Sequence, residues 1–167
     1  MRGYWVRDLS LAELGRRRIE WSRNFMPVLS RILERFDREK PLKGVRIGAC
    51  LHVTTETAIL VEALRRGGAE VSICASNPMS TQDDVAAAMA EDGVRVYAFR
   101  GQSFEEYYRC IGYVLASEPE ITIDDGADLI STIHKLYYGV ESDELKHVRE
   151  ASGGLEVKRL VEGVIGG

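Results

Sequence analysis

The sequence predicts an α/β fold in which a mostly parallel sheet is doubly wound, with helices on both faces and a helical segment leading into the sheet. Two observations carry this prediction. Four short apolar runs alternate with helical patterns of about 10 to 15 residues, and each return from a helix to the next run contains Gly or Pro. Apolar runs that alternate with helices are typical of parallel strands buried on both faces.

The first part of the chain predicts two helical segments. Ser10 and Glu13 have the spacing of a capping box, and apolar residues recur at helical spacing from Phe25 to Phe36. Pro27 falls inside this pattern, where a proline removes a backbone donor and kinks or interrupts a helix. The two segments are therefore expected to be bent or broken near Pro27.

The strands and the helices that follow them come next in the chain. The predicted strands are residues 45–51, 70–76, 94–99 and 121–125, and the predicted helices are 54–66, 80–91 and 103–116. Thr81 with Asp84, and Ser103 with Glu106, have the spacing of capping boxes. Residues 1–150 are interpreted as one Rossmann-like domain, and 151–167 as a short tail with an amphipathic stretch at 155–164.

Composition excludes several classes of function. The chain of 167 residues is 45% hydrophobic and 29% charged and has no apolar run of the ~20 residues that a membrane helix needs. Its net charge of −4 argues against nucleic acid as a partner, and the run Arg16, Arg17, Arg18 is interpreted as a solvated helix face. The start of the sequence lacks the pattern of a signal peptide, which predicts the cytoplasm, and the three cysteines are expected to be reduced structural thiols.

Polar residues gather where the predicted strands end. His52, Thr54 and Glu56 follow the first strand, Gln82 follows the second, and the doublet Asp124 and Asp125 ends the fourth. Ligands of doubly wound sheets bind at these carboxyl ends, so a polar pocket suited to a nucleoside or a sugar is expected there.

Each of these residues also has a purely structural interpretation. Thr54 is a natural helix cap, Glu56 suits the positive end of a helix dipole, and His52 could be a satisfied core histidine. The histidines have no zinc-ligand spacing, no metal site is expected, and there is no G-x-G-x-x-G motif.

The motifs "ACLHVTTETA", "STQDD" and "DDGAD", in this order, resemble the amino-terminal part of the substrate-binding domain of S-adenosylhomocysteine hydrolase (adenosylhomocysteinase), with an archaeal character in "SNPMSTQDD". The resemblance covers about residues 9–134. It implies a reversible hydrolysis of S-adenosylhomocysteine to adenosine and homocysteine, in which NAD oxidises the ribose 3′-hydroxyl before homocysteine leaves.

The resemblance also implies roles for five residues. Thr54 and Glu56 would hold the adenine edge and Gln82 would line the base pocket, so that these side chains bind substrate. His52 would lie near the ribose and the departing sulfur. Asp125 would bind substrate and act in acid–base steps near the 5′ carbon.

The later motifs of the family are missing from the sequence. These are a "SEETTTG" segment, a lysine and an aspartate that act on the 3′-hydroxyl, and a complete NAD-binding domain. The sequence therefore predicts a truncated substrate-domain fragment that holds no NAD alone and is inactive without a partner chain that carries the NAD domain. Two alternatives stay open, a stand-alone nucleoside-binding module and a non-catalytic remnant, and so does the oligomeric state, a homo-oligomer included.

Overall fold

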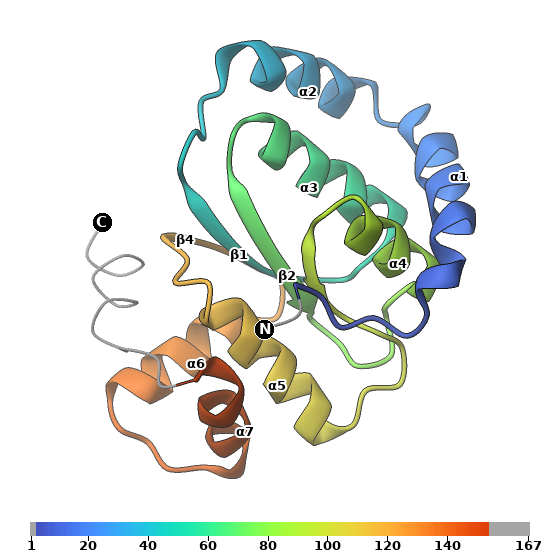
Figure 1. Ribbon diagram of the computed structural model, residues 1–167. Helices are drawn as coiled ribbons and strands as arrows, with labels where there is room; N and C mark the ends of the chain where they lie inside the picture. Colours follow the sequence, from blue (N-terminus) through green and yellow to red (C-terminus); the bar gives the residue numbers. More distant parts are fainter. Residues whose placement is uncertain (1–2, 154–167) are drawn as a thin grey trace.

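In the computed structural model, which describes residues 3–153, a four-stranded parallel sheet lies between two layers of helices (Figure 1). The strand order is β3-β2-β1-β4, and every neighbouring pair is parallel. The strands are β1 (Arg46–Leu51), β2 (Glu70–Ala75), β3 (Arg95–Tyr97) and β4 (Ile121–Asp124). The chain builds outward from β1 to β3 and then returns to place β4 on the other side of β1. The predicted doubly wound α/β fold is thus confirmed, and its switch point lies between β1 and β4.

The helices cover both faces of the sheet. They are a 3₁₀ turn (Leu9–Leu11), α1 (Ala12–Arg23), α2 (Pro27–Glu39), α3 (Thr55–Arg66), α4 (Asp83–Glu91), α5 (Phe104–Leu115), α6 (Asp128–Tyr137) and α7 (Asp143–Ser152). Helices α3 and α4 pack on one face, with α1 and α2 outside them, whereas α5, α6 and α7 lie on the other (Figure 1).

Side-chain alternation along the strands divides the core in two. Ile47 and Ala49 of β1 belong to the cluster under α3 and α4, while Cys50 belongs to the cluster under α5 and α6. Successive residues of a strand point to opposite faces, so an apolar run such as Ile47–Cys50 can supply both cores. All three cysteines are free and buried, which confirms the expected reduced thiols.

Helix starts agree with the sequence patterns only in part. Pro27 is the first residue of α2, where its missing N–H costs nothing, and Ser103 with Glu106 forms the predicted capping box of α5. The box predicted at Ser10 is wrong, because the Asp8 side chain caps the 3₁₀ turn and accepts from the N–H of Ser10. The box at Thr81 is also wrong, because α4 begins at Asp83 and Gln82 occupies its N-cap position.

The outer strands are shorter than predicted. β3 has three residues, and its outer edge pairs with Trp5, which donates to the Val96 carbonyl at 2.8 Å and accepts from Ala98 N–H at 3.0 Å. Helix α7 ends at Ser152, and the predicted amphipathic stretch 155–164 lies outside the described residues. No helix in the described part of the chain is both long and apolar enough to cross a membrane.

Candidate functional site

The turn between β1 and α3 is closed by side-chain hydrogen bonds. Thr54 is the N-cap of α3 in extended conformation, and its hydroxyl accepts from the N–H of Thr57 at 3.5 Å. Thr57 in turn donates its hydroxyl to the carbonyl of His52 at 2.6 Å. These contacts close the backbone from His52 to Thr57 without a glycine and give the polar side chains of the turn a structural role.

Glu56 stands in the first turn of α3 as an exposed carboxylate. Thr55 donates its hydroxyl to Glu56 Oε2 at 3.0 Å. The N–H of Glu56 itself, followed by the hydroxyl of Thr54, lowers the pKa of the Glu56 carboxyl below its ordinary value of 4.5. Glu56 is therefore a charged acceptor at neutral pH, and a ligand that meets it must offer a hydrogen-bond donor.

His52 and Asp125 meet at the switch point of the sheet. His52 Nε2 lies 3.3 Å from Asp125 Oδ2, and the hydroxyl of Ser76 donates to the same oxygen at 3.3 Å. The backbone N–H of Asp125 donates to the carbonyl of Cys50 at 3.2 Å, which continues the pairing of β4 with β1. Residues that follow β1, β2 and β4 thus converge on one half-exposed carboxylate.

The two members of the aspartate doublet have different surroundings. Asp124 Oδ2 accepts from the N–H of Ile130 at 2.9 Å and so fixes the start of α6. Asp128, at the start of the same helix, accepts from the hydroxyl of Tyr107 at 2.7 Å, and burial raises the pKa of that phenol. Asp124 and Asp128 therefore support α6, and Asp125 is the member of the doublet that reaches His52.

Gln82 is held by a helix that lies far from it in the sequence. Arg18 of α1 donates to Gln82 Oε1 at 2.9 Å and to both oxygens of Asp84, at 2.8 and 2.7 Å. A guanidinium only donates, so the amide oxygen of Gln82 must face Arg18 and its NH₂ group is directed elsewhere. The backbone N–H of Gln82 donates to the Val53 carbonyl at 3.0 Å, which keeps this loop beside the turn at Thr54.

The three arginines in α1 are all exposed, as expected for a solvated helix face, and they also make ion pairs. Arg17 is the most exposed of them, and Arg16 pairs with Glu91 at 2.7 Å and with Asp92 at 3.1 Å. Together with Arg18, Arg16 ties α1 along the length of α4. The sequence signal for these pairs is the set of acids at the two ends of α4, Asp84, Glu91 and Asp92, whose alignment with α1 depends on the fold.

The helix starts at this edge of the sheet do not suit a dinucleotide. The first turns of α3, α4, α5 and α6 all carry acidic residues, namely Glu56, Asp83, Asp84, Glu105, Glu106 and Asp128. A pyrophosphate needs free N–H groups and positive potential at such a position, and these carboxylates would repel it. Within residues 3–153, therefore, the groups present do not fit NAD. The same residues contain no cluster of three or more His, Cys, Asp or Glu able to hold a metal ion.

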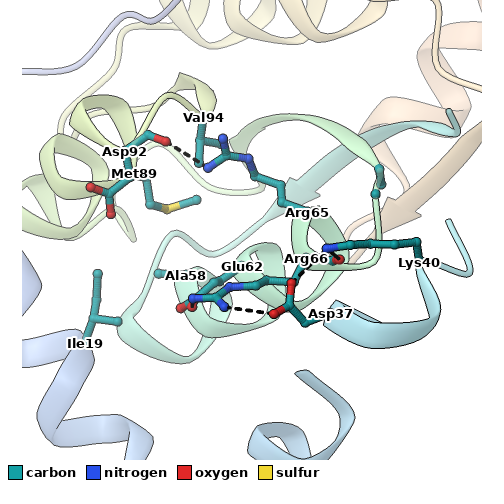
Figure 2. Close-up of a pocket in the computed structure, with 12 residues that line it drawn as sticks. Ile19, Asp37, Lys40, Ala58, Glu62, Arg65, Arg66, Met89, Asp92 and Val94 are labelled. Carbon is teal, nitrogen blue, oxygen red and sulfur yellow. Dashed lines mark hydrogen bonds and ion pairs between the residues drawn. The ribbon is translucent and has the colours of Figure 1, made fainter. Parts of the chain in front are cut away.

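A cavity of about 560 Å³ opens at the opposite edge of the sheet, beside the turns that precede β2 and β3 (Figure 2). Its charged side chains are already paired. Arg66 contacts Asp37 at 3.4 Å and Glu62 at 3.3 Å, while Arg65 donates to the Asp92 carbonyl at 2.9 Å. These groups hold α2, α3 and α4 together, and none of the residues predicted to be functional lines the cavity.

Comparison with known proteins gives a single family. The model of the S-adenosyl-L-homocysteine hydrolase family matches residues 3–163. The adenosylhomocysteinase of Pyrobaculum aerophilum is 52% identical over 162 residues, which are 97% of this chain and 37% of that protein. The adenosylhomocysteinase of Aquifex aeolicus is 56% identical over 90% of this chain and 36% of its own length. An S-inosyl-L-homocysteine hydrolase of Methanopyrus kandleri is 56% identical over 78% of this chain and 31% of its own length.

Proposed function

The chain belongs to the S-adenosyl-L-homocysteine hydrolase family, and on that premise we propose that its carboxyl-edge loops bind the nucleoside part of S-adenosylhomocysteine. The chain spans about 37% of the length of the Pyrobaculum relative. The proposed role is therefore that of the base-binding part of the enzyme. The hydrolysis itself is proposed for the assembly of this chain with the remaining segments of the family, supplied in the same polypeptide or by a separate one.

The charged acceptor at Glu56 is the observation that carries the proposal. Adenine presents an exocyclic amino group that can donate to this carboxylate, next to a ring nitrogen that can accept from the Thr54 hydroxyl. Hypoxanthine presents a carbonyl oxygen in place of the amino group, and two acceptors repel one another. The similar proteins include relatives named for the adenosyl substrate and relatives named for the inosyl substrate. The negative charge of the Glu56 carboxylate at neutral pH supports the adenosyl substrate.

His52 and Asp125 supply the acid–base part of the proposal. When His52 Nε2 donates to Asp125, its Nδ1 keeps a lone pair that can accept a proton. Elimination of homocysteine requires a proton on the departing sulfur, and addition of water requires the removal of one. A carboxylate and an imidazole in contact can exchange these protons with a substrate placed beside them.

The redox part of the reaction is assigned to other residues. NAD supplies hydride transfer at the ribose in this family, and the acidic helix starts of residues 3–153 do not fit its pyrophosphate. We assign NAD binding to a segment outside these residues or to a partner chain. The residues proposed to bind the base, Thr54, Glu56 and Gln82, all lie within the described residues, which also supports nucleoside binding by the chain alone, as a second candidate function.

The test is a calorimetric titration of the purified chain with adenosine and with inosine. Adenosine is expected to bind saturably, Glu56→Gln to weaken it by at least about tenfold, and inosine to bind at least about tenfold more weakly than adenosine. Glu105→Gln is the matched control, because Glu105 is an exposed acid in the first turn of α5. No adenosine heat from a folded protein, or equal losses in both variants, would refute the base-binding role.

A further inference from the structure

Two buried hydroxyls connect helix α1 to the carboxylate of Glu56. Ser22 donates to Thr55 Oγ1 at 2.8 Å, and Thr55 donates to Glu56 Oε2 at 3.0 Å. Ser22 and Thr55 are only 6% and 5% exposed. A charged carboxylate only accepts, so the Thr55 hydroxyl must donate to Glu56 and accept from Ser22. Ser22, Thr55 and Glu56 therefore form a hydroxyl relay of fixed direction, which begins in α1 and ends on the carboxylate.

The same helix also holds Gln82. Arg18 stands one helical turn before Ser22 and so lies on the same face of α1. Its guanidinium donates to Gln82 Oε1 at 2.9 Å and to both oxygens of the buried Asp84. This planar fork holds the Gln82 amide with its oxygen toward α1, which leaves the NH₂ group as the free donor. One face of α1 thus holds an acceptor at Glu56 and a donor at Gln82.

We infer that Ser22 and Arg18 are positioning residues that set a preference for adenine over hypoxanthine, because they hold Glu56 and Gln82 in fixed orientations. This inference rests on the proposed binding of the base by Glu56 and Gln82. The two bases differ at adjoining positions of one ring edge. Adenine has an amino donor beside a ring nitrogen that accepts, whereas hypoxanthine has a carbonyl acceptor beside a ring N–H that donates.

Side chains that are free to turn could adapt to either base. An unheld carboxylate at Glu56 could accept from the amino group of adenine, or move along the ring edge and accept from the ring N–H of hypoxanthine. An unheld amide at Gln82 could exchange its donor and its acceptor by rotation. With Glu56 held by Thr55 and Gln82 held by Arg18, neither adjustment is open. The wrong base then leaves polar groups unpaired, which is the physical basis of strong discrimination.

The charge state of Glu56 agrees with the direction of the relay. The N–H of Glu56, the hydroxyls of Thr54 and Thr55 and the charge of Arg18, in this order, lower the pKa of the Glu56 carboxyl, while burial opposes them. Arg18 belongs to α1, and Thr55 is held by Ser22 of the same helix. Helix α1 therefore contributes to both the orientation and the charge of this acceptor.

The experiment is a calorimetric titration of the full chain with adenosine and with inosine, before and after the double substitution Ser22→Ala with Thr55→Val. This variant removes both hydroxyls together, so neither is left buried without a partner and the chain is expected to fold. The ratio of adenosine affinity to inosine affinity should fall by about fivefold, the effect of one hydrogen bond. Ser72→Ala with Thr132→Val is the matched control, because these buried hydroxyls lie within β2 and α6, outside the carboxyl-edge loops.

Two conservative variants separate positioning from packing. Thr55→Ser keeps the hydroxyl and should keep the affinity ratio of the unmodified chain. Arg18→Lys keeps a cation beside Asp84, but one ammonium group does not replace a planar fork that serves two side chains, so the ratio should fall by about threefold. Thermal unfolding followed by circular dichroism checks that each variant is folded.

The outcomes separate this inference from the function on which it rests. If Glu56→Gln weakens adenosine binding but Ser22→Ala with Thr55→Val leaves the affinity ratio unchanged, positioning by α1 is refuted and base binding stands. If the double variant weakens both nucleosides equally, the relay serves only packing, and the inference is overturned in the same way. A folded chain that gives no heat with adenosine refutes base binding and this inference with it.

Discussion

Gly15 lies where α1 packs against α4, and its substitution by alanine tests the packing that places Arg18 beside Asp84. A Cβ added at Gly15 would lie 2.0 Å from the carbonyl oxygen of Asp84 and 3.0 Å from the Cβ of Ala88. Both neighbours belong to a buried helix, and the nearer one is backbone, so neither can turn aside. Helix α1 must then move away from α4 by about 1 Å or more to restore a normal contact.

Two opposing effects set the magnitude for Gly15→Ala. Alanine is the better helix former by about 1 kcal/mol, which alone would stabilise the protein. Overpacking costs about 1–3 kcal/mol, and the displacement also loosens Arg18 from Asp84, a carboxylate with only 9% of its side chain exposed. The sum predicts a net destabilisation of about 2 kcal/mol and a melting temperature lower by about 4–8 °C.

The assay for Gly15→Ala is thermal and urea unfolding followed by circular dichroism. Arg17→Ala is the control, because Arg17 lies on the same helix and its side chain is 76% exposed, so its loss should cost less than about 0.5 kcal/mol. A melting temperature for Gly15→Ala that equals or exceeds that of the unmodified chain would refute the close packing of α1 on α4.

Three further predictions concern the site and the core. In an enzyme reconstituted with the remaining segments of the family, Asp125→Asn should lower kcat by about 100-fold or more, a larger loss than that in adenosine affinity, and single-turnover kinetics would separate the two. The pKa of the Glu56 carboxyl is lowered from its ordinary value of 4.5, so this group is charged at any pH above that value. Adenosine affinity should therefore stay level from pH 8 to about 5 and fall only in more acid solution, and titrations with adenosine across this pH range would detect the fall. The three thiols should not react with a disulfide reagent at pH 8 until the chain unfolds, when all three should react. In the folded protein, hydrogen bonding to Cys50 together with burial raises the pKa of Cys74, and burial raises the pKa of Cys110.

Locally encoded features were predictable from the sequence. The alternation of apolar runs with helical periods predicted all four strands, because a strand buried on both faces needs apolar residues in succession. The box at Ser103 and Glu106 formed because both partners lie within one helical turn. The boxes at Ser10 and Thr81 did not form, since an N-cap also requires that the helix begin directly after that residue, and α1 and α4 begin at Ala12 and Asp83 instead.

The sequence by itself therefore determined the fold class, the order of its elements and the polar character of the loops at the carboxyl edge. Only the tertiary structure decided which of those polar residues meet. Asp125 reaches His52 and Ser76 because β4 lies beside β1, and Gln82 is fixed by Arg18 because α1 packs on α4. Periodicity is a property of neighbours along the chain, whereas these contacts join residues 49 to 73 positions apart. Their formation depends on strand order and helix packing, which no short stretch of sequence specifies.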